Sequence, residues 1–346
     1  MLHGIQTGDW HLEAMNRHFG PEGVDLQLAE IDKIYLYALE NGVTKIFVLG
    51  DITDTASMTD ETKGKLLAHF VKYDGVIETY YLGGNHDRAD AKRTSMDLIS
   101  QFVDWQFLKS FYVFMEPEQI VIDGIVVNFL PHPCRESIPH KKPCLNLVHC
   151  DIVGARGDNG HPLRTSHDIT VDKRDFTLGG HIHLFQELKR LILAGSPYQK
   201  TFGEALPKGF VEFKASYMKN KLYVSHKFVA NKPKFILETK IISEQQDFSS
   251  LVNNKYLRYR LFIEEGVVVP ADLRVRYPNI AQLRGVAKST LQEIEQGGTL
   301  EVKRAAKAMH PSRGLKRHLI SAGLKPTEIK ECRSLLKAAL SEIGYS

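Results

Sequence analysis

The first two-thirds of the chain alternates short apolar runs with amphipathic segments. Apolar residues recur at helical spacing over residues 31–39 and stop at Asn41-Gly42, a pair typical of a helix C-terminus. The run Lys45–Leu49 then indicates a buried strand, and a second helix over residues 60–73 leads to a strand over residues 77–82. This alternation predicts an α/β domain.

Further along the chain, the apolar pattern changes to a period of two. Residues 120–122 and 125–127 flank Asp123-Gly124, which is the commonest short signal for a hairpin turn. Further strands are expected at residues 145–148, at residues 176–178 and in a hairpin over residues 211–229 that turns near Lys219-Asn220. The pattern therefore predicts that the second half of the domain is rich in strands.

A change of composition after residue 230 predicts further domains. The polar stretch 231–234 marks a boundary, and beyond it we expect short strands such as 256–263, a helix near 280–295 and a linker at 296–298. The remainder has helical periodicity, and its last helix carries an apolar stripe. We therefore predict a main domain over residues 1–230, a small α+β cap domain over residues 231–298 and a helical tail over residues 299–346.

The composition excludes several classes of protein. With 346 residues, 43% hydrophobic and 25% charged, the chain is neither disordered nor fibrous, and no apolar run is long enough to cross a membrane. It begins without a signal-peptide pattern, and the four cysteines form no C-x-x-C pair. We therefore expect reduced thiols and a cytoplasmic protein that is not embedded in a membrane.

The net charge of +4 is distributed unevenly. Residues 301–346 hold ten Lys or Arg against four Asp or Glu, which leaves a net charge of −2 on residues 1–300. The basic excess therefore lies in the tail, where the apolar stripe favours a surface that binds a partner.

Five loops that follow apolar runs deliver Asp, Asn or His, and most of them contain glycine. Ligands gather at the carboxyl ends of strands in α/β sheets, and glycine lets backbones approach closely there. We therefore predict one metal site built from all five loops. Its candidate ligands are Asp9, His11, Asp51, Asn85, His149, His181 and His183.

The chemistry of these donors narrows the choice of metal. Carboxylates, an amide oxygen and imidazoles, with no thiolate, suit Mn²⁺, Fe²⁺ or Mg²⁺ better than a structural zinc ion. Should His149 not be a ligand, His161 or His167 in the following loop would replace it.

The motifs over residues 5–215 resemble those of the calcineurin-like metallophosphoesterases, namely D-x-H, G-D-x-x-D, G-N-H-[DE], a lone His and G-H-x-H. The resemblance implies a four-layer α/β/β/α sandwich. It also implies that Asp9, His11, Asp51 and His183 hold one metal ion, while Asp51, Asn85, His149 and His181 hold the second. His86 would lie beside the scissile phosphate, with Asp54 or Asp87 supporting the ligands or His86.

Within that family, the chain is most similar to SbcD-type nuclease subunits of bacteria and phages. The stretches Asp9-Trp10-His11-Leu12 and Gly50-Asp51-Ile52-Thr53-Asp54, and Ala194-Gly195-Ser196-Pro197 after the last motif, carry this similarity. It implies a Mn²⁺-dependent DNA nuclease, an exonuclease on double-stranded ends and an endonuclease on hairpins or single strands. It further implies a homodimer that works with an SMC-like coiled-coil ATPase in the cytoplasm of a bacterial cell or a phage-infected host.

Two other functions stay open at this point. One is a stand-alone phosphodiesterase or phosphatase that acts on small or protein substrates. The other is a non-catalytic adaptor for DNA ends or for the ATPase. A complete ligand set together with His86 argues against an adaptor, because a scaffold has no need for that histidine beside two metal ions.

Overall fold

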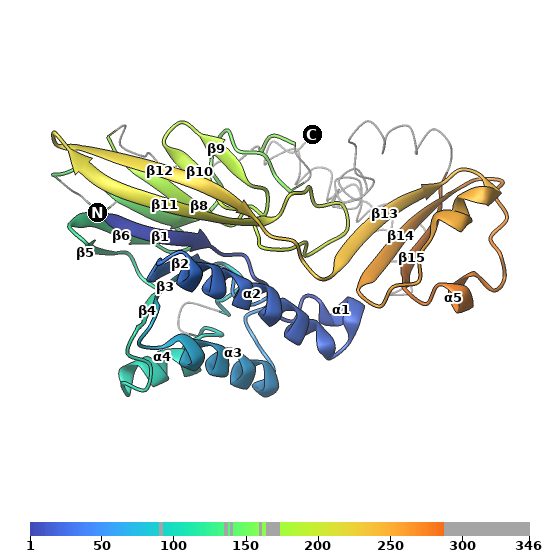
Figure 1. Ribbon diagram of the computed structural model, residues 1–346, viewed down its shortest axis with the longest axis horizontal. Coiled ribbons are helices and arrows are strands. Elements are labelled where there is room, and N and C mark those ends of the chain that lie inside the picture. The colour runs from blue at the N-terminus through green and yellow to red at the C-terminus, as the bar shows by residue number, and fades with distance from the viewer. Residues whose placement is uncertain (90–92, 135–137, 139–140, 159–160, 164–173, 287–346) are drawn as a thin grey trace, which may run out of the picture. The chain divides into compact units, whose positions relative to one another are not determined.

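Two six-stranded sheets form the core of the computed structural model, which describes residues 1–89, 93–134, 138, 141–158, 161–163 and 174–286 (Figure 1). The first sheet has the order β12-β11-β1-β2-β3-β4, with β1 to β4 parallel and the β11–β12 hairpin antiparallel beside β1. Its strands are β1 (Leu2–Thr7), β2 (Lys45–Leu49), β3 (Glu78–Leu82), β4 (Phe111–Phe114), β11 (Gly209–Met218) and β12 (Lys221–Ala230).

The second sheet has the order β5-β6-β7-β8-β10-β9. The four strands from β6 to β10 in this order are parallel, and β5 and β9 pair antiparallel at the two edges. Its strands are β5 (Glu118–Ile122), β6 (Ile125–Leu130), β7 (Leu145–His149), β8 (Phe176–Gly180), β9 (Gln186–Leu188) and β10 (Leu191–Leu193).

The alternation of side chains along β2 explains why the two sheets stack. Ile46 and Val48 pack into the core beneath the helices, whereas Phe47 and Leu49 pack into the core between the sheets. Because both faces of the strand are buried, its sequence is an uninterrupted apolar run, as the sequence predicted. The chain is therefore a mixed α/β sandwich.

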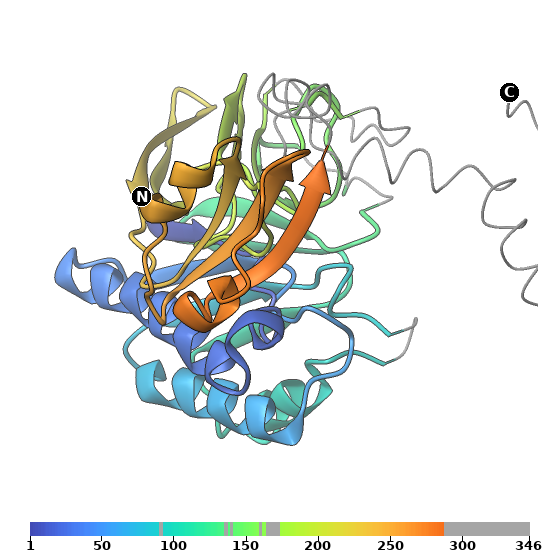
Figure 2. The same cartoon turned by 90° about the vertical axis from the view of Figure 1, so that its right-hand side faces the viewer.

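Helices cover the outer face of the first sheet, where α2 and α3 lie side by side (Figure 2). The helices are α1 (Asn16–Phe19), α2 (Glu22–Glu40), α3 (Asp60–Tyr73) and α4 (Asp97–Asp104). Both helices predicted for this region are confirmed, and α3 begins where the side chain of Thr59 accepts a hydrogen bond from Thr62 N at 3.2 Å.

Loops, rather than helices, cover the outer face of the second sheet within the described residues. Val148 and Leu193 point to this face, opposite to their neighbours Leu147 and Ile192 in the core between the sheets. Loop residues such as Ile152 pack against them. The described layers are therefore helix, sheet and sheet.

Both predicted hairpin turns are confirmed. Asp123-Gly124 joins β5 to β6 with φ of 49° and 79°, and Lys219-Asn220 joins β11 to β12 with φ of 49° and 60°. Positive φ at both central residues is the conformation that suits the twist of a two-residue hairpin.

A third sheet, β13-β14-β15, follows and contradicts one prediction. It consists of β13 (Ile236–Ile242), β14 (Leu257–Glu264) and β15 (Ile280–Val286), with a short 3₁₀ helix at Gln245–Ser250 and α5 at Leu273–Arg276. The helix expected near residues 280–295 is wrong over 280–286, because pairing in this sheet outweighs the apolar spacing of this stretch. Residues 287–295 lie outside the described part.

The chain divides into two compact units. One comprises Met1–Lys240, Gln246–Leu261 and Val269–Leu283, and the other comprises Ile241–Gln245, Phe262–Val268 and the residues from Arg284 onward. The predicted division into residues 1–230, 231–298 and 299–346 stays a prediction, and the tail lies outside the described residues. No helix among the described residues combines the length and apolar character that a membrane crossing requires.

Candidate metal centre

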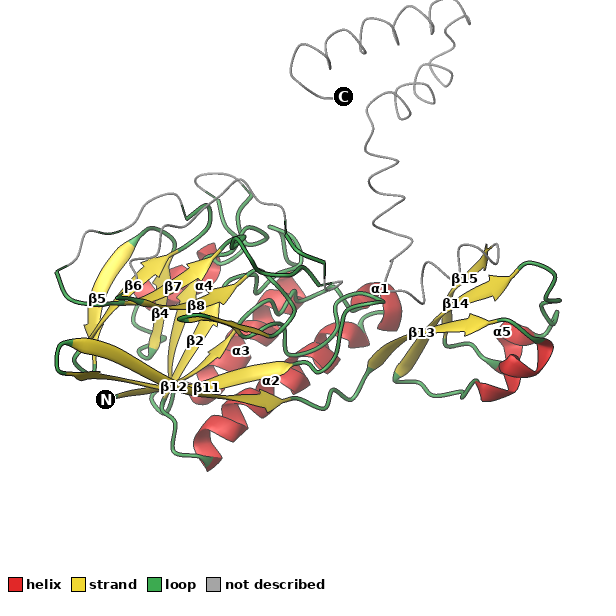
Figure 3. Ribbon diagram, turned by 90° about the horizontal axis from the view of Figure 1, so that it is seen from above, coloured by secondary structure: helices red, strands yellow, loops and turns green. Residues whose placement is uncertain are grey.

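All seven predicted ligands lie in loops at the carboxyl ends of strands from both sheets. Asp9 and His11 follow β1, Asp51 follows β2, Asn85 follows β3, His149 ends β7, and His181 and His183 follow β8. Loops (green in Figure 3) connect the strands and helices of this unit. The stacking of two parallel sheets therefore brings five distant segments of the sequence to one place.

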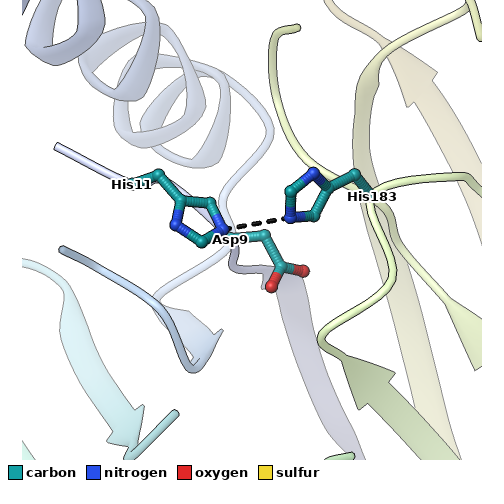
Figure 4. A group of neighbouring side chains, drawn as sticks. All are labelled: Asp9, His11 and His183. Carbon is teal, nitrogen blue, oxygen red and sulfur yellow. Dashed lines mark hydrogen bonds between the residues drawn. The ribbon is translucent and has the colours of Figure 1, made fainter. Parts of the chain in front are cut away.

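The first cluster consists of Asp9, His11 and His183, all of which are buried (Figure 4). His11 Nε2 lies 3.0 Å from His183 Nε2, and one ligand atom from each of the three residues falls within 4.8 Å of the others. Two imidazole nitrogens that face each other beside a carboxylate form a set of donors that fits a divalent cation.

The second cluster consists of Asp51, His149 and His181, with the amide of Asn85 between the two rings. Asn85 Oδ1 lies 3.0 Å from His149 Nε2 and 3.0 Å from His181 Nδ1, and Asp51 Oδ1 lies 3.3 Å from His149 Nε2. Oxygen and nitrogen donors again converge, and no sulfur is among them.

Asp51 lies between the two clusters. Its Oδ1 approaches His149 Nε2 of the second cluster at 3.3 Å, and its Oδ2 approaches His11 Nε2 of the first at 3.6 Å. A carboxylate in this position can donate one oxygen to each of two ions. The backbone N–H of His86, in the loop after β3, donates to Asp51 Oδ1 at 2.9 Å.

The loops adopt backbone conformations that fit this close packing. A Cβ on Gly50, where φ is 86°, would lie 2.0 Å from His149 Nδ1, and a Cβ on Gly84 would lie 2.2 Å from Asp51 Oδ1. Asp9, His11 and Asp51 themselves have φ of 52°, 44° and 52°, which is unusual for residues other than glycine. Strain of this kind is typical of sites whose geometry serves a function.

Buried charges in the clusters compensate one another. Burial raises the pKa of Asp51, but His149 and His11 outweigh it and hold that pKa well below its usual range. Burial lowers the pKa of His149, but Asp51 and Asp9 raise it to about 10. Burial raises the pKa of Asp9 to about 6. The buried carboxylate of Asp51 and the imidazole of His149 thus stabilise each other's charge.

The imidazoles are oriented by groups behind them. His149 Nδ1–H donates to the carbonyl oxygen of Leu49 at 2.7 Å, which directs Nε2 toward Asp51 and Asn85. His183 Nδ1 is buried 3.2 Å from Asp158 Oδ2 and 3.6 Å from Glu204 Oε1, so its Nε2 faces His11. Such partners fix the tautomer and the direction of a ligand histidine.

Glu204 belongs to a buried ion pair that sequence analysis missed. Its Oε2 lies 2.7 Å from Lys208 Nζ, which also donates to the carbonyl oxygen of His183 at 2.8 Å and to Ser196 Oγ at 3.0 Å. Both charged side chains are almost fully buried. The only signal in the sequence is Glu204 after Gly203, with Lys208 four residues later, which by itself indicates a turn.

His86 and Asp54 lie beside the first cluster. His86 Nδ1–H donates to the carbonyl oxygen of Asp54 at 2.6 Å, and its half-buried ring meets that of His11 edge to face at 4.7 Å. The Asp54 carboxylate lies 3.6 Å from His11 Nδ1 and pairs with Lys200 at 2.9 Å and Arg17 at 2.8 Å. Lys200 Nζ also lies 3.0 Å from His11 Nδ1, a neighbour that sequence analysis missed.

Asp87 has a different environment from Asp54. Its buried carboxylate accepts hydrogen bonds from Asp51 N at 2.7 Å, Gly84 N at 3.0 Å, Thr53 N at 3.0 Å and Thr53 Oγ1 at 3.1 Å. Both oxygens are therefore used to hold the loops that carry Asp51 and Asn85. These contacts give Asp87 a positioning role, and Asp54 is the carboxyl residue in contact with His86.

Of the two histidines named as alternatives to His149, only His161 lies among the described residues. His161 is exposed, and its carbonyl oxygen accepts a hydrogen bond from Gly157 N at 2.9 Å. His167 lies outside the described residues. His149 itself is buried and in contact with Asp51 and Asn85.

Comparison with known proteins yields structural likenesses alone. No family model matches the sequence, and no curated protein matches it significantly. The Pseudomonas putida nuclease MPE has a TM-score of 0.29 and 15% identity, with 64% of this chain and 87% of that chain covered. A protein of unknown function from Aquifex aeolicus, AQ665, has a TM-score of 0.20 and 18% identity, with 41% and 64% covered. The functional argument therefore rests on the residues of this chain.

Proposed function

We propose that the chain is a metal-dependent phosphodiesterase that cleaves DNA. The observation that carries the proposal is the position of Asp51, which faces His11 of one cluster with one oxygen and His149 of the other with its second oxygen. The order of the motifs around these residues, similar to that of SbcD-type nucleases, supports the choice of a DNA phosphodiester as substrate.

The donor sets fit two ions. Asp9, His11, Asp51 and His183 would hold one ion, and Asp51, Asn85, His149 and His181 would hold the other. Divalent ions bound there would supply positive charge and Lewis acidity for the attack of water on a phosphodiester. Mn²⁺ is our first choice because oxygen and imidazole donors predominate, and Mg²⁺ and Fe²⁺ are the alternatives.

His86 has the position and tautomer for proton transfer. Because its Nδ1–H is directed to the carbonyl oxygen of Asp54, its Nε2 stays available to hold a proton for the leaving oxygen or to stabilise charge on the phosphoryl group. General acid catalysis of this kind contributes about 10²- to 10⁴-fold to the rate. Asp54 anchors His86 through its backbone and His11 through its carboxylate.

The proposal extends to the assembly that the resemblance implies. We propose a homodimer in the cytoplasm that acts with an SMC-like coiled-coil ATPase on DNA ends and hairpins during recombination, repair or replication. The segment 301–346, in which basic residues outnumber acidic ones, would provide the partner surface. Deleting residues 300–346 should abolish co-purification of the ATPase while hydrolysis of a small aryl phosphodiester persists.

The decisive experiment is a cleavage assay with purified protein. End-labelled duplex, hairpin and single-stranded DNA and a phosphopeptide are each incubated with Mn²⁺, with and without the ATPase, and Asp51→Asn serves as the control. We expect DNA cleavage by the wild type only. Cleavage of the phosphopeptide alone would instead favour a phosphatase, and cleavage of no substrate would favour an adaptor.

A further inference from the structure

Beside α1, an arginine carries a charge that its described contacts do not neutralise. Arg258 on β14 donates to the carbonyl oxygens of His18 at 2.7 Å, Lys255 at 2.8 Å and Leu257 at 3.0 Å, and its guanidinium lies 4.2 Å from the centre of the Phe19 ring. None of these partners is a carboxylate. The side chain is therefore fixed in direction while its positive charge stays available.

Two lysines extend this positive region. Lys234 Nζ and Lys255 Nζ lie 4.4 Å and 4.8 Å from the centre of the Tyr256 ring, and both lysines are exposed. The two ammonium groups lower the pKa of Tyr256. Among nearby carboxylates, Glu22 acts on Lys255 only through space. Two like charges are thus held at one ring, an arrangement that an anion would stabilise.

The helix α1 connects this region to the metal centre. Arg17 on α1 pairs with Asp54, the residue that anchors His86, and its neighbour His18 accepts the hydrogen bond from Arg258. Burial lowers the pKa of His18 to about 4, and the nearby charges of Arg17 and Arg258 contribute to this shift. All these residues belong to the same compact unit.

We call Arg17, Arg258, Lys255 and Lys234 the α1 cation row. We propose that it binds backbone phosphates of a nucleic acid strand next to the phosphate that is cut in the metal centre. This inference rests on the proposed function and specifies its substrate class as a polymer. A row of separate cations matches a chain with one negative charge per nucleotide, whereas a small ester would contact the metal centre alone.

The α1 cation row lies in a part of the chain that carries a slight negative net charge. Residues 1–300 carry a net charge of −2. Three members of the row, Arg258, Lys255 and Lys234, have no ion pair with a carboxylate among their described contacts, whereas Arg17 pairs with Asp54. Lys33, another lysine in this region, is already paired with Glu30 at 2.6 Å. The charges of Arg258, Lys255 and Lys234 are thus open to an anion, and the paired Arg17 connects them to Asp54 beside the metal centre.

The test combines Lys234→Glu and Lys255→Glu in the full-length chain, because both side chains are exposed. Lys219→Glu with Lys221→Glu, at the exposed β11–β12 turn, is a control with the same change of net charge. Binding of an oligonucleotide of about 30 nucleotides is measured by fluorescence anisotropy in EDTA at several salt concentrations, and thermal melting verifies folding. Hydrolysis of bis(p-nitrophenyl) phosphate with Mn²⁺ is measured in parallel.

We expect the row variant to bind the oligonucleotide at least about tenfold more weakly and to lose about two units of the log–log salt slope. Hydrolysis of the small ester should stay within about twofold of wild type. The control pair should change neither quantity. Arg258→Gln, which removes a single charge, should lower the salt slope by about one unit.

Two results would overturn the inference. One is wild-type binding and salt slope in the row variant, and the other is a wild type that does not bind the oligonucleotide even at low salt. Failure of the proposed function is a separate outcome. If the wild type binds DNA through the row but cleaves none of it with Mn²⁺, the row stands and the nuclease proposal fails.

Discussion

The two clusters of the metal centre differ in what lies behind their ligands. In the first cluster, His183 rests against Glu204 and Asp158, and Glu204 is held by Lys208 in an ion pair whose side chains are only 2% and 1% exposed. In the second cluster, His181 is 27% exposed and is backed by Asp151, itself 38% exposed, at 3.2 Å. The first cluster is supported by buried charge, whereas the second reaches solvent through His181.

This difference predicts unequal roles for the two ions. A ligand held by buried partners loses little freedom when an ion binds, so the first cluster should bind the tighter ion. The second cluster, through the partly exposed His181, is where an ion exchanges more readily and where a substrate can approach. Asp51 couples the two, because its oxygens face a histidine in each cluster.

The largest effect is expected from Asp51→Asn. This variant should weaken metal binding at both clusters and so remove the difference in affinity between them. The amide removes a negative charge that faces His11 and His149 together. Isothermal titration with Mn²⁺ should show both ions weakened at least about a hundredfold, and DNA cleavage should cease. Unchanged binding of two ions would contradict the position of Asp51 between the sites.

Next in size is His86→Ala, which separates the binding of ions from turnover. Because His86 is held by Asp54 and belongs to neither ligand set, both ions should bind as in the wild type. The turnover number on DNA should fall at least about a hundredfold, since the imidazole proposed to assist the leaving oxygen is removed. Turnover close to that of wild type would exclude His86 from the chemistry.

Glu204→Gln should affect the first site selectively. Loss of the charge leaves Lys208 buried without its partner and removes one of the two carboxylates that face His183 Nδ1. We expect the tighter ion to weaken about 10- to 100-fold and the protein to lose about 3 kcal/mol of stability. Titration with Mn²⁺ and chemical denaturation measure the two effects.

A double variant separates these two effects of Glu204. Adding Lys208→Met removes the unpaired buried charge, so stability should recover in part while the tighter ion stays weak. Recovery of the affinity together with stability would show that Glu204 acts on the fold as a whole. It would then have no specific effect on His183.

The sequence indicated which loops carry the candidate ligands because each loop has its signal locally. Asp51 follows a strand and a glycine, and His149 ends an apolar run, so their shared edge follows from the geometry of parallel sheets. The function of Glu204 depends on a loop that folds back on His183, a contact that no spacing encodes. The spacing over residues 280–286 predicted a helix, whereas pairing with a neighbouring strand decided the structure.

The smallest effect is expected from Asp151→Asn, which tests how much the partly exposed carboxylate behind His181 contributes to the second cluster. Since both Asp151 and His181 are partly exposed, their contact is screened by solvent and is worth at most about 1 kcal/mol. Removing the charge should weaken the looser ion no more than about fivefold and leave the tighter ion unchanged. Glu187→Gln, which removes an exposed carboxylate from His226, is the matched control and should change neither ion. Asp151→Asn could instead weaken the ion of the second cluster as much as Glu204→Gln weakens the ion of the first. Solvent exposure would then not distinguish the two clusters, and the difference between them would have to lie in the ligands themselves.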